Sequence, residues 1–138
     1  MLIEQALDFI KNSNIGIHTV SSEGIIEYAN DHELNILGYS EEEYVGHHVS
    51  EFQFDKSCLD QMMNKLVKLE SFTNFPAMVY GKHKVLYMLY NSSVYENESE
   101  FIHTRCFGSE ISESVYYACK REYKKSLTHR VGTLSSYP

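Results

Sequence analysis

The segment 24–46, GIIEYANDHELNILGYSEEEYVG, constrains the fold most, because a strand and two very short helices fit into it, each with its own start and stop signals. The run IIEY is rich in residues that favour strands. Each helix then begins with a polar residue followed three positions later by Glu, a pair whose side chains can satisfy each other's backbone amides. Gly38 and Gly46 end the helices. The predicted capping residues are Asn30, Glu33, Ser40 and Glu43. Helices this short suit a pocket wall better than a core.

Apolar periodicity predicts the remaining elements. They are a helix over 2–11, strands over 15–20 and 25–28, a longer helix from Asp55 or Ser57 to about 70, strands over about 73–80, 84–95 and 100–108, and a helix over 112–127. The short connections between the last three strands favour antiparallel hairpins. The element order predicts an α+β fold, a five-stranded antiparallel sheet with helices packed on one face.

The composition is that of one globular domain. The chain has 138 residues, 43% of them apolar and 22% charged, and no apolar run approaches the roughly 18 residues that span a bilayer. Its first residues lack the basic stretch and cleavage site of a signal peptide. A net charge of −7 argues against a nucleic-acid partner. Cys58, Cys106 and Cys119 are widely spaced and odd in number, which argues against a disulfide framework and for a reducing, cytoplasmic location.

The pattern Y-x-N…LGYS-x-E-E-x-x-G within 24–46 resembles the first half of a PAS sensory domain. Residues 91–94 (NSSV), an acidic turn and residues 101–107 (FIHTRCF) resemble the last two PAS strands. Residues 110–112 (EIS) stand where such domains often end, just before a signalling helix.

The resemblance covers about residues 12–112 and implies three parts. They are an N-terminal helix over 1–12, a PAS domain over 13–112 and a C-terminal linker helix with a loose tail over 113–138. The implied function is a sensory module of signal transduction, which binds a small ligand or a partner and relays the change to the helix after Ser112. The chain would be the input of a larger sensor, such as a two-component histidine kinase or a cyclic-dinucleotide enzyme, or a stand-alone adaptor. The alternatives are a ligand-free dimerisation module and a small α+β enzyme that uses His47 or His48 as a base.

Strand parity in the PAS register predicts which side chains face the space between sheet and helices. On the last three strands the inward series are Phe75, Ala77 and Val79, then Tyr87, Leu89 and Asn91, then Ile102, Thr104 and Cys106. The first hairpin and the helices add Tyr28, Leu34, Leu37, His48, Phe52 and Met62. This mostly apolar set with a few polar groups is typical of small-ligand pockets, although a packed core without a ligand has the same composition. A slip by one residue would instead turn inward Tyr80, Met88, Tyr90, His103 and Arg105.

No cofactor is predicted, because the residues that would hold one are missing. Flavin photoreceptors of the PAS type carry a reactive Cys after the second glycine, and residues 46–52 (GHHVSEF) have none. Haem-binding PAS domains often use a His early on the long helix, and residues 55–69 (DKSCLDQMMNKLVKL) have none. Cys58 on that helix fits a core position better than a thiolate ligand, and His47 and His48 lack a third metal ligand. The purified protein is therefore expected to be colourless.

We predict that the chain is not an enzyme. The sequence has no G-x-S-x-G, P-loop, H-E-x-x-H or dinucleotide motif. Residues 127–131 (LTHRV), with His129 at their centre, faintly resemble the phosphoacceptor segment of some histidine kinases, but no nucleotide-binding domain accompanies them.

The helix over 2–11 predicts a homodimer. It is rich in apolar residues and, at this length, is marginal alone. It must therefore cover the outer face of its own sheet, a partner's helix, or both. PAS domains commonly dimerise through such a leading helix, which favours the partner.

Overall fold

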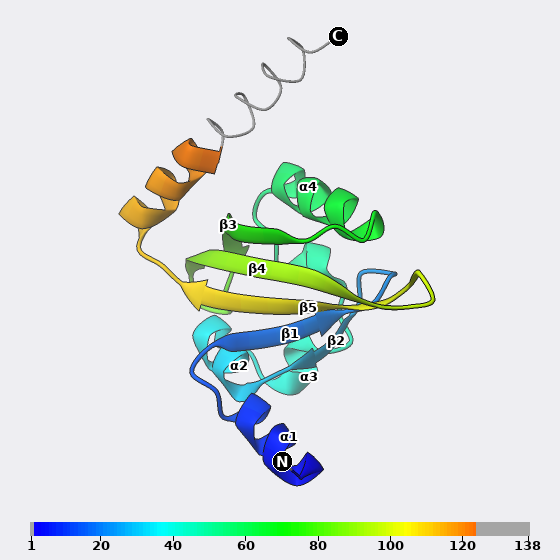
Figure 1. Ribbon diagram of the computed structural model, residues 1–138. Helices are drawn as coiled ribbons and strands as arrows, with labels where there is room; N and C mark the ends of the chain where they lie inside the picture. Colours follow the sequence, from blue (N-terminus) through cyan, green and yellow to red (C-terminus); the bar gives the residue numbers. More distant parts are fainter. Residues whose placement is uncertain (1, 124–138) are drawn as a thin grey trace, which may run out of the picture.

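The computed structural model describes residues 2–123, which form one antiparallel sheet with short helices gathered on one side of it (Figure 1). The five strands lie in the order β2-β1-β5-β4-β3. The elements in chain order are α1 (Ile3–Lys11), β1 (Gly16–Val20), β2 (Ile26–Ala29), α2 (Asp31–Leu37), α3 (Glu41–Tyr44), the 3₁₀ helix η1 (Val49–Glu51), α4 (Lys56–Val67), β3 (Phe72–Tyr80), β4 (Val85–Asn97) and β5 (Glu100–Glu110). A last helical segment is described over residues 113–123. The predicted α+β fold with an N-terminal helix is confirmed.

Strand β1 sits between β2 and β5 and so joins the first hairpin to the last three strands. His18 on β1 lies opposite Cys106 on β5, and Cys106 lies opposite Ser92 on β4. Directly opposed residues of antiparallel strands present their side chains on the same face. His18, Cys106 and Ser92 therefore form one row across three strands, called the polar row below, and all three side chains are buried.

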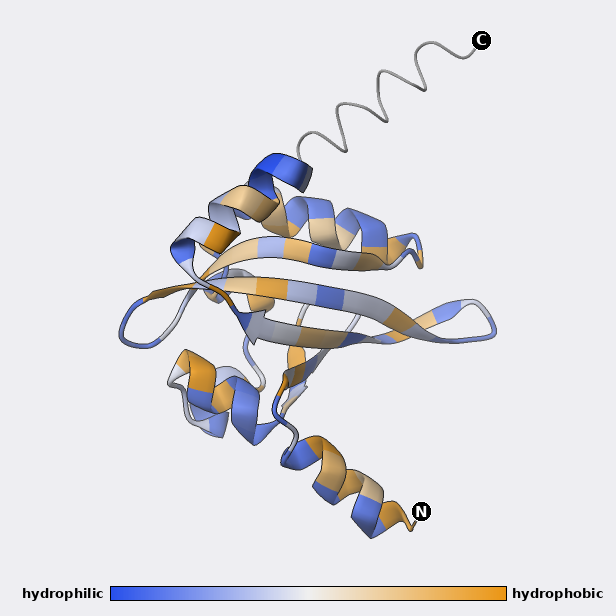
Figure 2. Cartoon of the chain, turned by 60° about the vertical axis from the view of Figure 1, so that its left-hand side comes forward, coloured by the Kyte–Doolittle hydropathy of each residue, from blue (hydrophilic) through white to orange (hydrophobic). Residues whose placement is uncertain are grey.

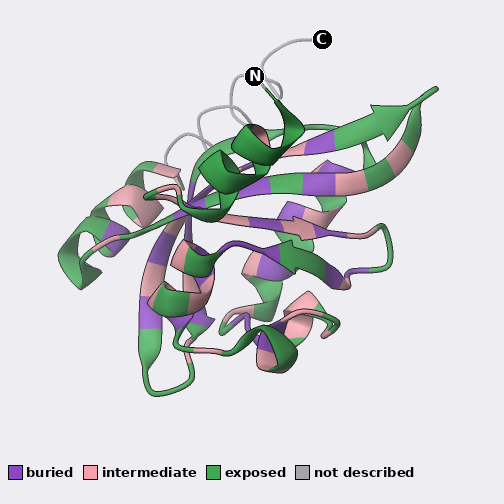
Figure 3. Cartoon of the chain, turned by 90° about the horizontal axis from the view of Figure 1, so that it is seen from below, coloured by how far each residue is buried: buried purple, intermediate pink, exposed green. Residues whose placement is uncertain are grey.

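On strand β4, the side chains that face the helices are not the predicted ones but their neighbours. Its buried residues are Leu86, Met88, Tyr90, Ser92 and Val94. Tyr87, Leu89 and Asn91 lie on the other face and are half-buried, so the prediction for this strand is wrong by one residue. The pairing gives the reason, because Met88 lies opposite Ala77. Ala77 is fully buried on β3, so its partner must point inward as well; Figure 3 shows the resulting alternation along the strands.

Helix α2 begins at Asn30, whose Oδ1 accepts a hydrogen bond from the Glu33 backbone N–H at 3.0 Å. The expected return bond from the Glu33 side chain does not form. The Asn30 N–H donates instead to the Ile17 carbonyl at 2.9 Å, and the Glu33 carboxylate turns into the core toward His18. The Glu33 carboxylate thus pairs with the buried His18 and not with the backbone N–H that the capping pattern predicted.

Side chains also cap the next two α-helices, reciprocally at α3 and from one side at α4. At α3, Ser40 Oγ accepts from the Glu43 N–H at 3.2 Å, and Glu43 Oε1 accepts from the Ser40 N–H at 2.9 Å. Of the two possible starts of α4, Asp55 is the N-cap, because its side chain accepts from the backbone N–H groups of the first turn. These caps fix the direction in which α3 and α4 leave the sheet.

Helix α1 lies apart from the sheet, and none of its residues is buried (Figure 1). Leu2, Ile3, Leu7 and Phe9 are between 61% and 79% exposed. Figure 2 shows these apolar residues along a helix that projects from the rest of the chain. Within residues 2–123, α1 therefore does not cover the outer face of its own sheet.

The helical segment 113–123 packs on β4 and β3, at the edge of the sheet opposite β2. The Tyr116 side chain is 2% exposed, and its ring centroid lies 5.0 Å from that of Tyr87 on β4. The Tyr123 ring lies 4.9 Å from that of Phe75 on β3. Both contacts attach the segment to the sheet.

The rest of the predicted helix over 112–127, and the segment around His129, lie outside the described residues. Among residues 2–123, no helix is long and apolar enough to cross a membrane.

Candidate functional site

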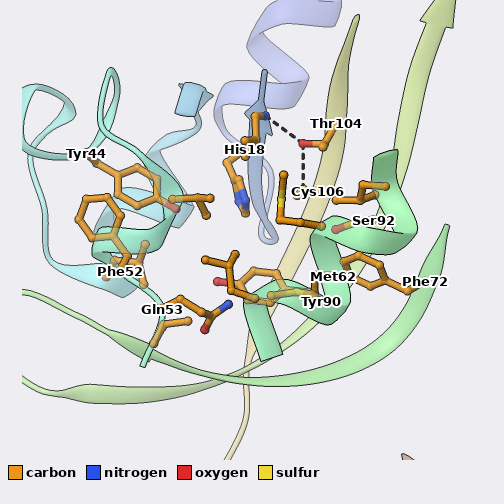
Figure 4. Close-up of a pocket in the computed structure, with 17 residues that line it drawn as sticks. His18, Tyr44, Phe52, Gln53, Met62, Phe72, Tyr90, Ser92, Thr104 and Cys106 are labelled. Carbon is orange, nitrogen blue, oxygen red and sulfur yellow. Dashed lines mark hydrogen bonds between the residues drawn. The ribbon is translucent and has the colours of Figure 1, made fainter. Parts of the chain in front are cut away.

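A cavity of about 60 Å³ lies between the sheet and helices α2 to α4 (Figure 4). Its apolar lining is Val20, Leu37, Val49, Phe52, Leu59, Met62, Met63, Leu66, Phe72 and Val79. Its polar lining is His18, Tyr44, Gln53, Tyr90, Ser92, Thr104 and Cys106. One water needs roughly 10–15 Å³ on this measure, so the space fits a molecule of a few atoms or a small cluster of waters.

His18 is held at the cavity by a buried carboxylate. Its Nδ1 lies 3.0 Å from Oε2 of Glu33, which comes from α2 and is 0% exposed. The rings of Tyr44 and Tyr90 stand edge-on to the imidazole, with centroids 6.4 and 5.8 Å away. A buried carboxylate is costly unless it is paired, so Glu33 favours the protonated imidazole.

Cys106 occupies the middle of the polar row. Its thiol donates a hydrogen bond to Thr104 Oγ1 at 3.1 Å, and the same oxygen accepts from the Val20 N–H at 2.9 Å (Figure 4). The backbone bond fixes the Thr104 hydroxyl, and the hydroxyl in turn fixes the sulfur. Cys106 is thus held by a hydrogen bond within β5, and it lies opposite His18 on β1 and Ser92 on β4.

The histidine and the cysteine shift each other's protonation. Burial alone lowers the pKa of His18, but the neighbouring Cys106 and Glu33 outweigh it and raise that pKa well above its ordinary value. Burial would raise the pKa of the Cys106 thiol, but His18, with smaller contributions from the hydroxyls of Ser92 and Thr104, lowers it. The favoured state is an imidazolium beside an acidified thiol.

Two polar atoms at the cavity have no partner among the described residues. They are Oε1 of Gln53 and Oγ of Ser92, on side chains that are 4% and 5% exposed. Glu33 Oε1 is a third such atom, deeper in the cluster. Buried polar atoms are nearly always hydrogen-bonded, to water or a ligand if not to protein. These atoms therefore mark the cavity as a site for a polar guest.

The structure brings only part of the predicted ligand-binding set to the cavity. Leu37, Phe52, Met62, Thr104 and Cys106 line it. Leu34, Phe75 and Ala77 pack in or against the core without lining it. The corrections are Tyr28 and Ile102, which are exposed, and Tyr87, Leu89 and Asn91, which lie on the other face of the sheet. Whether the lining residues bind a ligand stays a prediction.

His48 is a further correction, and it weakens the enzyme alternative. It is exposed and caps η1, with its ring packed over Gly24. His47 is half-exposed and pairs with Glu51 at 3.3 Å. Neither histidine lines the cavity, so a base there would have to be His18.

Sequence reasoning missed His18, Glu33 as its partner, Gln53 and the inward face of β4. One signal could have found His18. In the segment IGIHTV, alternation places Gly16, His18 and Val20 on one face of the strand and Ile17 and Thr19 on the other. Pairing with the inward Cys106 then assigns His18 to the inward face.

A ring contact links the cavity to the C-terminal segment. Phe72 lines the cavity, its ring lies 5.2 Å from Phe75, and Phe75 lies 4.9 Å from Tyr123. Nζ of Lys120, in the same segment, lies 3.6 Å from Oδ2 of Asp55 at the start of α4. A hollow of about 220 Å³ separates α4, β3 and this segment. A change in the cavity wall thus has two short routes to the segment 113–123.

Metal ions need several converging ligands, and large cofactors need more space than about 60 Å³. Within residues 2–123, no three His, Cys, Asp or Glu side chains converge on one point that could hold a metal ion. Drug-sized ligands occupy pockets of roughly 300–1,000 Å³, so a flavin or a haem would require α3 and α4 to move outward. The cysteine at this cavity comes from β5, and the wall from η1 and α4 contributes no histidine.

The fold has many counterparts among solved structures. A PAS domain of an HTR-like protein from Haloarcula marismortui is 19% identical, with a TM-score of 0.67 over 78% of this chain and 90% of that one. A PAS domain from a two-component sensor histidine kinase is 14% identical, with a TM-score of 0.66 over 78% and 95%. The dark structure of the blue-light photoreceptor Aureochrome1 LOV is 16% identical, with a TM-score of 0.72 over 91% and 94%. These identities establish a common fold and no common chemistry.

Comparison with curated proteins gave no match. The sequence profile of the PAS domain, by contrast, matches residues 14–126. That match covers most of the chain and agrees with the sheet order and the helices. The chain therefore belongs to the PAS domain family of sensory modules.

Proposed function

We propose that this chain is the input module of a signal-transduction protein, which binds a small polar molecule in the cavity and relays its presence to the segment 113–123. The observation that carries the proposal is the pair of buried, unpartnered atoms, Gln53 Oε1 and Ser92 Oγ, in a mostly apolar wall. A guest that donates to one and bonds the other would offset the cost of burying these two atoms without a partner. Three unpaired cysteines support a reducing, cytoplasmic setting.

The relay is supported by the contacts of Phe75. Its ring touches Phe72, which lines the cavity, and Tyr123, which belongs to the C-terminal segment. A guest that shifts Phe72 changes the packing available to Tyr123. The downstream effector would be a kinase, a cyclic-dinucleotide enzyme or a separate protein.

A ligand-free dimerisation module is the second candidate. The exposed apolar residues of α1 favour it, because such side chains are usually covered. The two candidates differ in whether the cavity is ever filled. They share the expectation that α1 meets a second copy.

Binding is tested with two neighbouring serines. Small molecules released from the purified protein are identified by mass spectrometry, and each is returned to the wild type, to Ser92→Val and to Ser93→Val. Ser93 is half-buried on the other face of β4, so its variant is the matched control. A bound ligand raises the melting temperature by mass action. We expect this rise in the wild type and in Ser93→Val, and its loss in Ser92→Val. If no released or added molecule produces it, the ligand-free module is favoured.

The relay is tested by hydrogen exchange of residues 113–123 with and without the ligand. We expect ligand to change exchange in the wild type and in Phe54→Leu, whose ring packs on Tyr80. In Phe75→Leu the ligand should still stabilise the domain but leave exchange in the segment unchanged. An unaltered response in Phe75→Leu would contradict this route.

A further inference from the structure

We propose that Cys106 is the reactive group of this cavity and that hydrogen peroxide oxidises its thiolate to a sulfenic acid. The proposal rests on the proposed function, since it uses the same cavity, and it names both the signal and the residue that receives it. Three observations carry it: the surroundings of the sulfur, the partners of the histidine opposite it, and the size and polarity of the space beside it.

The sulfur lies among groups that favour an anion. His18 is directly opposite Cys106 on β1, and Ser92 is directly opposite on β4. Thr104 Oγ1 is 3.1 Å away. The hydroxyls of Thr104 and Ser92 can each turn a hydrogen toward a thiolate, and the Ser92 oxygen has no other partner. Hydrogen bonds to a thiolate and a nearby imidazolium both favour ionisation.

Glu33, together with Cys106, favours the cationic form of His18. The carboxylate is fully buried, and its Oε2 lies 3.0 Å from His18 Nδ1. With Nδ1 donating to Glu33, the second ring nitrogen is left for the sulfur. The neighbours accordingly raise the pKa of His18 and lower the pKa of Cys106, each against the effect of burial on the charged form.

The space next to the sulfur selects a small neutral molecule. About 60 Å³ admits only a few heavy atoms, which excludes a peptide thiol or disulfide as the guest. The largely apolar wall disfavours an ion. Hydrogen peroxide has two heavy atoms and two O–H donors, which match the unpartnered oxygens of Gln53 and Ser92.

The reaction balances with groups at the cavity. The Cys106 thiolate attacks one peroxide oxygen, the S–O bond forms and the O–O bond breaks. Sulfur loses two electrons, and the leaving oxygen takes a proton from His18 and departs as water. The products are a neutral sulfenic acid and a neutral imidazole, so the charge beside Glu33 changes at the moment of sensing.

Cys58 is the natural internal control. It is more exposed than Cys106, lies beside Asp55 rather than a histidine, and has a pKa raised to about 12 by burial and that carboxylate. If access alone decided reactivity, Cys58 would react first. If the fraction of thiolate decides the reactivity of a cysteine, Cys106 reacts first.

The test treats the folded full chain with hydrogen peroxide, quenches it, unfolds it in dimedone and quantifies labelled cysteines by peptide mass spectrometry. We expect labelling of Cys106 at least about tenfold faster than of Cys58. His18→Gln and Glu33→Gln should slow labelling of Cys106 by a similar factor. His47→Gln, which removes the exposed His47–Glu51 pair, should leave it unchanged.

Equal rates at Cys58 and Cys106, or labelling of Cys106 only in chains unfolded beforehand, would overturn the proposal without requiring any variant to fold. A rate in folded His18→Gln equal to that of the wild type would overturn it as well. Failure of the broader function is separate: a reversible ligand that still stabilises Cys106→Ser, with no peroxide reaction in the wild type, would sink this inference and leave ligand sensing intact.

Discussion

At the scale of single residues, Asn30 joins three elements. Its Nδ2 donates to the carbonyls of Ile10 and Ile15 at 3.0 and 2.9 Å and to Ser13 Oγ at 3.0 Å. Its Oδ1 accepts from the Ile17 N–H as well as from the first turn of α2. The side chain is 1% exposed, so it is far more than a helix cap.

Asn30→Ala is therefore expected to lower the free energy of unfolding by about 2–4 kcal/mol, since it removes a cap and leaves buried backbone groups unpaired. Ser40→Ala removes an exposed cap alone and should cost about 1 kcal/mol. Asn97→Ala, at the exposed end of β4, should cost less still. Urea denaturation of the three variants gives the comparison, and equal losses for Asn30 and Ser40 would show that the extra hydrogen bonds contribute nothing.

His18 makes the free energy of unfolding of the chain depend on pH. Its pKa in the folded chain lies well above 6.5 because Cys106 and Glu33 outweigh burial. A raised pKa stabilises the folded state fully below the unfolded value, near 6.5, and the contribution is lost as pH rises through the folded value. The lowered pKa of Cys106 works in the opposite sense, with a contribution that is lost as pH falls through its folded value. Tyr44 and Tyr90, which also face the ring, have pKa values raised further by burial and stay neutral in this range.

Because His18→Gln also removes the opposing contribution of Cys106, the His18 effect is measured in a Cys106→Ser background. There the difference in unfolding free energy between His18 and His18→Gln should be largest near pH 6 and shrink as the pH rises toward 9, since Glu33 lies 3.0 Å from the ring. His47→Gln, on the surface, should change the free energy little at any pH in this range. Denaturant titrations at several pH values measure both differences. A constant difference for His18→Gln would mean that His18 has the same pKa in the folded and the unfolded chain.

At the scale of elements, the two faces of β4 should differ sharply. Met88 is 0% exposed against the helices, whereas Leu89 is half-buried on the outer face. Met88→Ala should cost about 2–4 kcal/mol through lost burial and a residual cavity. Leu89→Ala should cost under about 1 kcal/mol. Denaturation midpoints measure the contrast, and the reverse order would restore the register predicted from the sequence.

The elements themselves could be predicted, because caps, glycines and apolar periodicity mark their ends. The register of β4 could not, because its residues are apolar on both faces along VLYMLY and alternation carries no contrast there. On β5 the alternation of His103 and Arg105 with Thr104 and Cys106 gave that contrast, and the inward pair is placed as expected. The residues of the site were predicted less completely than the elements of the fold. The alternation of IGIHTV separates His18 from Ile17 but does not say which face is buried, and Glu33 and Gln53 are buried by tertiary contacts that no local pattern reports.

At the scale of the whole molecule, the PAS fold supplies the cavity but not its chemistry. Solved structures that share the fold include PAS domains only 13% and 19% identical in sequence, and a fold can host unrelated sites. The polar row is a property of this chain's own residues. It gives the cavity a charged, titratable side and an apolar side, which suits a small reactive guest better than a large planar one.

The outermost part of the molecule is α1, and its exposed face predicts a homodimer. Ile3, Leu7 and Ile10 follow helical spacing, and none of the three is buried within the described chain. Pairing with the same face of a second copy would remove this stripe from water, the main driving force for association. We expect a dimer in size-exclusion chromatography with light scattering at about 100 μM, well above a micromolar Kd.

Leu7→Glu should turn that dimer into a monomer, because it puts a charge into the apolar stripe on both copies. Gln5→Glu adds the same charge two positions away, among the exposed polar residues of α1, and should leave the dimer intact. A wild-type chain that stays monomeric at this concentration would refute the dimer. A dimer that survives Leu7→Glu would move the interface to another surface, such as the outer face of the sheet around Phe107, which is 38% exposed.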